Sequence, residues 1–167
     1  MANNDFNGKV FLDVPVSEMA TKGYKMIMNE LYSHITTSDY ITNTIRSQCN
    51  SQSRLCVGGA NAVAVTLQLV ACGNCYAITS ETAWNIPVLD NGVYWYFTPA
   101  KSFGFSPFIG VEQGAADLLT LNGNERLSWP TATGGYRIGR TKGAAAERKM
   151  MFIKDYPVVT IAATTGL

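Results

Sequence analysis

Residues 92–107 read GVYWYFTPAKSFGFSP, a pattern typical of two short β-strands joined by a loop. Side chains alternate between the two faces of a pleated strand. The expected rows are Val93, Trp95 and Phe97 on one face and Tyr94, Tyr96 and Thr98 on the other. One row is expected in the core. The other should lie under another element, at an interface or against a ligand, because a large exposed aromatic patch normally marks recognition.

Period-two alternation continues through much of the chain after Ser53. Large apolar or aromatic side chains occupy every second position in three segments. They are Val63, Val65, Leu67 and Leu69 in the first, Leu127 and Trp129 in the second, and Tyr136 and Ile138 in the third. Apolar runs at 150–153 and 158–161 indicate strands covered on both faces. Turn signals stand between these segments, at 58–59, 73–74, 90–92, 122–124 and 134–135. About eight antiparallel strands between residues 54 and 163 predict a β-sandwich or barrel.

The N-terminal part has a different period. Between residues 13 and 47, apolar residues recur at helical spacing, at Val16, Ala20, Tyr24, Ile27, Leu31 and Ile35. A second, shorter helix is expected to begin at Ser38 or Asp39 and to carry Ile41 and Ile45. The predicted fold is therefore α+β and mainly β, with a helical segment packed on an antiparallel domain. The length of the chain suits a single domain spanning residues 1–167.

The composition argues against a nucleic-acid partner, because the net charge is only +1. Charged residues make up 15% of the chain, well below the roughly 25% usual for globular proteins. This deficit is expected either where partners hide the surface or where Thr, Ser, Asn and Gly cover a monomer. No apolar run approaches the roughly 18 residues that a membrane helix needs.

The four cysteines at 49, 56, 72 and 75 lie close together in the middle of the chain. An even count of this kind predicts two disulfides in an oxidising compartment, with three pairings open. Free buried thiols, half a zinc site or a redox pair at 72–75 are the alternatives. The residues after Cys75 have strand-like composition, which disfavours the helix that a redox pair usually opens. The first fifteen residues lack signal-peptide features, so an extracellular location is expected only if the cysteines are paired.

Catalytic groups are sparse, and we expect neither enzymatic activity nor a cofactor or metal. His34 is the only histidine, and it is expected near a helix C-terminus without a catalytic role. The loop carboxylates are Asp90, Glu112, Asp117 and Glu125, of which the middle two are the candidate acid and base pair. GGYRIGR at 134–140 lacks the Lys-Ser/Thr that follows a phosphate-binding loop.

Three function classes are compatible with these features. The first is a self-assembling structural subunit, a homo-oligomeric filament or shell component, whose segments 10–12 and 158–163 add to a neighbour's sheet edge. The second is a glycan-binding module. Its candidate residues are Tyr94, Tyr96, Trp129, Tyr136, Arg126 and Arg137, with Asn91 and Asn124 nearby. The third is a membrane-active protein, with an amphipathic helix beside an aromatic β-domain in a layout similar to that of the actinoporins.

Overall fold

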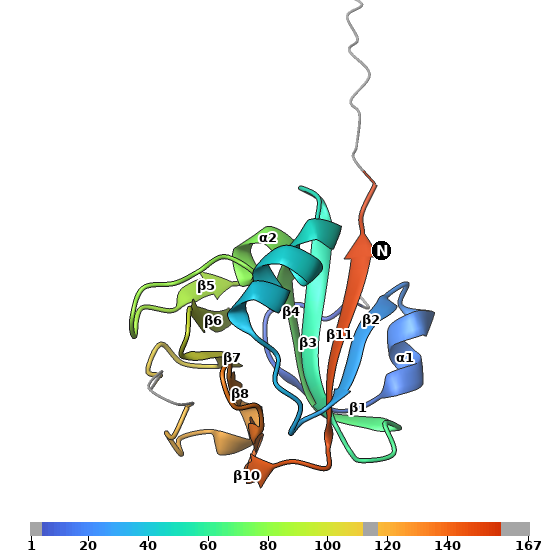
Figure 1. The fold of residues 1–167 in the computed structure, drawn as a ribbon. Helices are drawn as coiled ribbons and strands as arrows, with labels where there is room; N and C mark the ends of the chain where they lie inside the picture. The colour runs from blue at the N-terminus through green and yellow to red at the C-terminus, as the bar shows by residue number, and fades with distance from the viewer. Residues whose placement is uncertain (1–4, 112–116, 158–167) are drawn as a thin grey trace, which may run out of the picture.

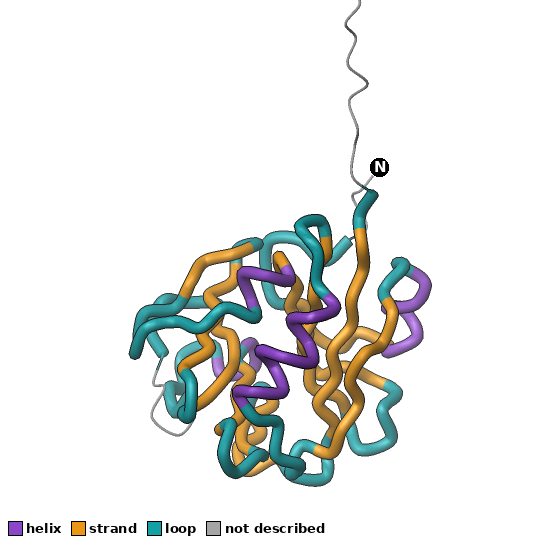
Figure 2. Tube along the Cα trace, turned by 45° about the horizontal axis from the view of Figure 1, so that its top comes forward, coloured by secondary structure: helices purple, strands orange, loops and turns teal. Residues whose placement is uncertain are grey.

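The computed structural model describes residues 5–111 and 117–157 and consists of two antiparallel sheets with a few short helices (Figures 1 and 2). The five-stranded sheet has the order β1 (Phe11–Pro15), β4 (Thr66–Asn74), β3 (Ser53–Ala60), β11 (Arg148–Asp155), β2 (Lys25–Leu31). The six-stranded sheet has the order β10 (Thr141–Ala144), β9 (Tyr136–Ile138), β8 (Leu127–Pro130), β7 (Ser102–Ser106), β6 (Val93–Thr98), β5 (Val88–Asp90). The prediction of a mainly β, antiparallel protein is confirmed.

The helices are short. They are α1 (Val16–Thr21), the π-helix η2 (Tyr40–Ile45), the 3-10 helix η3 (Arg46–Gln48), α2 (Cys75–Ile78) and the 3-10 helix η4 (Gly123–Glu125). In the described part of the chain, none has the length and apolar character that crossing a membrane requires. The short helix expected at Ser38 or Asp39 is confirmed, and both of its isoleucines are buried.

The long helical segment predicted for 13–47 is wrong over Lys25–Leu31, which forms strand β2. Helix α1 ends because Gly23 takes a φ of +88°, and the amides of Gly23 and Tyr24 bond back to Ala20 and Met19. The chain then pairs with β11, where Met28 lies opposite Met151. His34 consequently lies after a strand and not on a helix, and the membrane hypothesis loses the helix on which it relied.

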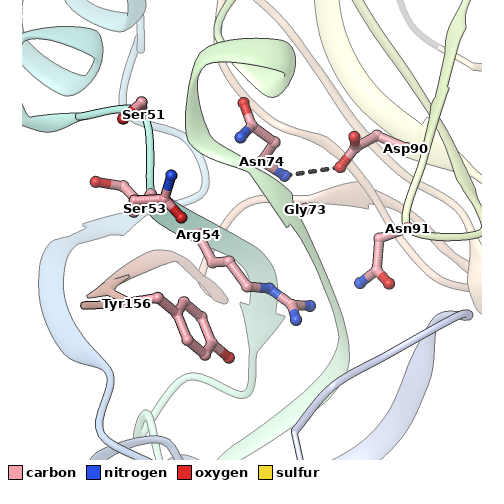
Figure 3. Close-up of a pocket in the computed structure, with 9 residues that line it drawn as sticks. Ser51, Ser53, Arg54, Gly73, Asn74, Asp90, Asn91 and Tyr156 are labelled. Carbon is pink, nitrogen blue, oxygen red and sulfur yellow. Dashed lines mark hydrogen bonds between the residues drawn. The ribbon is translucent and has the colours of Figure 1, made fainter. Parts of the chain in front are cut away.

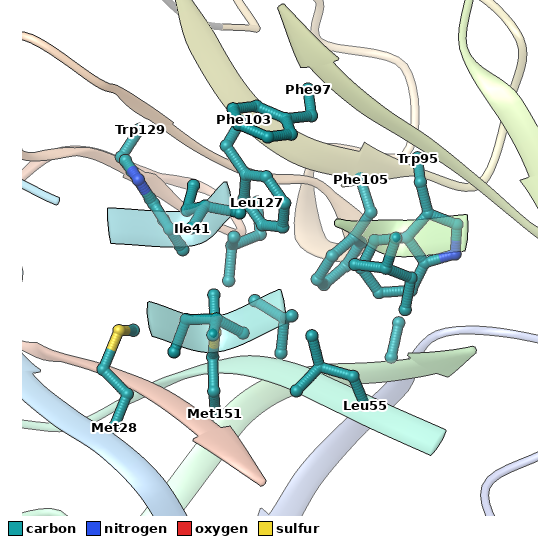
Figure 4. Close-up of a cluster of buried hydrophobic side chains, with 14 of the residues drawn as sticks. Met28, Ile41, Leu55, Trp95, Phe97, Phe103, Phe105, Leu127, Trp129 and Met151 are labelled. Atoms are coloured by element: carbon teal, nitrogen blue, oxygen red, sulfur yellow. The ribbon is translucent and has the colours of Figure 1, made fainter. Parts of the chain in front are cut away.

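The main core lies between the two sheets. Val93, Trp95 and Phe97 point into it, as the alternation of β6 predicts. Figure 4 shows Phe103, Phe105 and Trp129 directed toward Leu55 and Met151 of the other sheet. The helical segment η2 lies beside both sheets in Figures 1 and 2, and its Ile41 and Ile45 also belong to this core.

The five-stranded sheet is covered on its other face as well. Along β11, Met151 and Ile153 belong to the main core, whereas Met150 and Phe152 pack with Phe6 and α1 in a second cluster. The apolar run at 150–153 is therefore covered on both faces, as predicted. The second run, 158–161, lies outside the described residues.

Two of the predicted turns are not turns. Gly58–Gly59 lies inside β3, where a Cβ on Gly59 would come within 2.7 Å of Ile138 from the other sheet. Gly73 lies in β4, and Asn74 caps α2 by accepting a hydrogen bond from the Ala77 amide at 3.0 Å. Glycine therefore marks close packing at these two sites.

Candidate functional site

The outer face of the six-stranded sheet carries a buried polar cluster that includes three of the predicted binding residues. Arg126 and Arg137 are each 1% exposed and Tyr96 is fully buried. The Arg126 Nη1 atom lies 2.7 Å from the Asp117 carboxylate, and Arg137 Nη1 lies 3.9 Å from its other oxygen. Burial lowers the pKa of Arg137, although Asp117 acts in the opposite direction.

Both arginines also hold the loop that follows β7. Arg126 donates to the carbonyl oxygens of Leu121 and Gly110, and Arg137 donates to those of Asp117 and Leu119. These contacts tie Gly110, Asp117, Leu119 and Leu121 to the sheet. Because Asp117 is fully buried and paired with both arginines, the cluster holds the described residues on either side of 112–116 in place. Glu112, its expected acid–base partner, lies outside the described residues.

The other predicted aromatic residues are not brought together on one face. Trp129 is fully buried in the main core, on the opposite side of the sheet from Tyr96. Tyr94 is half-buried on β6, opposite Leu89 of β5. Tyr136 is half-buried beside a separate glycine-lined pocket. The aromatic row of Tyr94 and Tyr96 therefore lies partly under another element, one of the three positions expected for it.

Lys149 on β11 is fully buried, which the sequence did not reveal. Its ammonium donates to the His34 carbonyl at 2.6 Å and to the Thr36 hydroxyl at 2.7 Å, and it lies 4.8 Å from the centre of the Trp129 ring. Burial lowers the pKa of Lys149 to about 8, partly opposed by Glu30.

We expect this lysine to make the protein more stable as the pH rises from about 8 toward about 10, because over that range the unfolded chain binds the extra proton. Urea unfolding at pH 7.5 and 9.5 measures the effect, and both values lie below the ordinary tyrosine pKa of about 10. The increase should disappear in Lys149→Met and persist in Lys25→Met, which removes an exposed lysine. A flat or falling profile in the unmodified protein would contradict this assignment.

All four cysteines form disulfides, which confirms that part of the sequence analysis. Cys56 pairs with Cys72 across β3 and β4, where the two residues are directly opposite, and Cys49 pairs with Cys75. Contrary to the strand-like composition after it, Cys75 begins helix α2, because Asn74 supplies the cap. Within the described residues, no three His, Cys, Asp or Glu side chains gather as metal ligands would.

A polar cleft of about 420 Å³ opens where β3, β4, the β5–β6 turn and the end of β11 meet, next to the strands that the Cys56–Cys72 disulfide joins (Figure 3). Its walls include Arg54, Asn74, Asp90, Asn91 and Tyr156. Asp90 accepts a hydrogen bond from the Asn74 amide at 2.7 Å. This approach requires a glycine at the preceding residue of β4, because a Cβ there would lie 2.4 Å from the Asp90 carboxylate.

Other contacts hold the cleft's side chains in place. Asn91 donates to the carbonyl oxygens of Phe6 and Cys72 and accepts from the Gly8 amide. Arg54 donates to the Phe6 carbonyl and the Asn7 side chain. The N-terminal segment that carries Phe6, Asn7 and Gly8 is anchored by Asp5. Burial opposes ionisation of this residue, but a hydrogen bond from Tyr24 and nearby cations keep its pKa below the ordinary value.

The second exposed feature is an apolar surface along the β5 edge of the six-stranded sheet, here called the edge surface. It consists of Trp84, Ile86, Val88 and Leu89, whose exposed fractions range from 44% to 64%. Residue Thr82 bonds to Phe97 of β6 and Val88 pairs with Trp95, so the segment runs along β6. The uncharged stretch TAWNIPVL at 82–89 was a usable signal for this surface.

Comparisons with protein-family models, with curated proteins and with solved structures found no match to this chain. The function must therefore be argued from the cleft, the buried cluster and the edge surface themselves.

Proposed function

We propose that the protein is a self-assembling structural subunit, and that two copies associate through strand β5. A strand at the edge of a sheet has a row of unpaired backbone groups, and antiparallel pairing with a second copy satisfies them. The same strand serves on both sides of the contact, so one two-fold axis relates the copies. In this arrangement the two six-stranded sheets would join edge to edge.

The observation that carries the proposal is that edge strand β5 has no exposed charged side chain. The other three edge strands each carry an exposed charged side chain, which is Asp13 in β1, Lys25 in β2 and Lys142 in β10. Such charges normally discourage edge-to-edge pairing. The only charged residue of β5 is Asp90, whose carboxylate bonds to the Asn74 amide. The side chains left on the edge are the apolar Val88 and Leu89.

A second set of exposed apolar side chains supports assembly beyond a dimer. They are Phe108, Ile109, Leu118 and Leu121, with exposed fractions between 40% and 66%. A subunit with two separate contact surfaces can form a filament or a closed shell, whereas one two-fold contact stops at a dimer. We further interpret the two sheets as the layers of a β-sandwich, since their facing side chains share one core.

Light scattering after size exclusion tests the proposal with Val88→Lys, which places a charge on the edge. The unmodified protein should exceed the monomer mass of 18.1 kDa at micromolar concentration. Val88→Lys should reduce the assembly mass about twofold or more, because the two-fold contact is lost. Val63→Lys is the matched control, since Val63 is 73% exposed but lies in a turn. A monomeric unmodified protein, or equal loss in both variants, would disprove self-assembly through β5.

A further inference from the structure

We propose that the polar cleft beside the Cys56–Cys72 disulfide binds a neutral saccharide, in a site separate from the assembly surface. The cleft of about 420 Å³ falls within the range of small-molecule sites. Its lining comes from segments far apart in sequence, and the disulfide holds two of them, β3 and β4, together. Such a site can bind a ligand without first having to order its walls.

The charges of the cleft favour a ligand that is itself uncharged. Arg54 supplies one positive group and Asp90 one negative group, and the remaining lining side chains are neutral. An anion would meet the carboxylate of Asp90, and a cation would meet the guanidinium of Arg54. A sugar hydroxyl donates and accepts at once, so it can use both groups.

The hydrogen-bonding groups of the cleft are already oriented. Asp90 accepts from the Asn74 amide through one carboxylate oxygen, Oδ2. The Asn74 side-chain oxygen caps α2, which fixes the direction of its NH₂ group. Fixed donors and acceptors lower the entropic cost of binding a small polar molecule.

Tyr156 supplies the aromatic contact, beside two cations: Lys154 Nζ lies 4.7 Å and the guanidinium carbon of Arg54 6.0 Å from the centre of its ring. This half-buried residue follows β11 and forms one wall of the cleft, as Figure 3 shows. Sugar rings have apolar faces of C–H groups, which an aromatic ring covers while polar neighbours bind the hydroxyls. The predicted glycan site is thereby moved from the β6 tyrosines to this cleft, of whose lining the sequence analysis had named Asp90 and Asn91.

A printed array of neutral, sialylated and sulfated glycans, probed with the labelled full chain, tests this inference. We expect saturable binding to a subset of the neutral glycans. Tyr156→Ala should weaken that binding about tenfold or more, since loss of an aromatic contact commonly has an effect of this size. Asp90→Asn should also weaken it, while still accepting from the Asn74 amide. Far-UV circular dichroism should be unchanged in both variants.

Tyr136→Ala is the matched control, because Tyr136 is equally half-buried but lines a different pocket. It should bind like the unmodified protein. The inference is overturned by binding to acidic glycans alone, by the absence of saturable binding to any neutral glycan, or by loss of binding in Tyr136→Ala but not in Tyr156→Ala. Titration with a soluble form of the bound glycan distinguishes this site from assembly. The Val88→Lys variant should bind this soluble glycan with the affinity of the unmodified protein.

Discussion

Replacing Asp117 with alanine is expected to lower the free energy of unfolding by about 3 to 5 kcal/mol, because removing one member of a buried ion pair leaves the others uncompensated. Asp117 is fully buried, and its loss would leave Arg126 and Arg137 without their carboxylate. Denaturant unfolding followed by tryptophan fluorescence measures the change.

Glu125→Ala is the control for that prediction. Its carboxylate, in the same loop region, accepts only an exposed hydrogen bond from Asn122 among the described residues. We expect a change below about 1 kcal/mol for this variant. Equal effects of the two substitutions would show that the Asp117 cluster does not hold the loop against the sheet.

Removing the Cys56–Cys72 disulfide by replacing both residues with alanine should cost about 3 kcal/mol, mainly by relaxing the constraint on the unfolded chain. The two cysteines are separated by 16 residues in sequence. Guanidinium unfolding without reductant measures this loss. The Cys49–Cys75 pair, with a separation of 26, provides the comparison and should contribute a similar amount.

Reductant provides the test of the same prediction in the unmodified protein. Adding it should lower the stability of the unmodified protein by more than that of either double variant, because the unmodified chain loses both bonds. If reductant leaves the unmodified protein unchanged while full reduction is verified by thiol counting, the disulfides contribute no stability and the prediction is wrong.

The β6–β7 hairpin could be predicted from sequence because its information is local. Alternation along Val93–Thr98 fixes which side chains reach the core, and the turn at 90–92 starts the first strand. Short-range signals also located the helix carrying Ile41 and Ile45. In each case, the deciding residues lie within a few positions of one another.

The failure at Lys25–Leu31 has a physical reason. Apolar residues three and four apart occurred there by coincidence, and Gly23 ended the helix before the spacing could matter. What determines β2 is its pairing with β11, more than a hundred residues later. A pattern confined to a local window contains no information about such a partner.

The two proposed functional surfaces also differ in how far a local sequence pattern could predict them. The edge surface is one continuous uncharged stretch, 82–89, and a search of the sequence for such stretches could have found it. The cleft is assembled from segments around residues 53, 73, 90 and 156, which no local pattern brings together. The burial of Arg126 and Arg137 likewise depends on Asp117, which the sequence analysis treated as a loop carboxylate and a candidate acid or base.

The central claim, pairing of β5 with a second copy, is tested most directly by hydrogen–deuterium exchange at two protein concentrations. Peptides covering 82–90 should exchange more slowly at high concentration, since edge amides gain partners in the assembly. Peptides covering the charged edge strand β10, Thr141–Ala144, should exchange at the same rate in both samples. Concentration-independent exchange at 82–90, or protection that appears at β10 instead, would contradict the account.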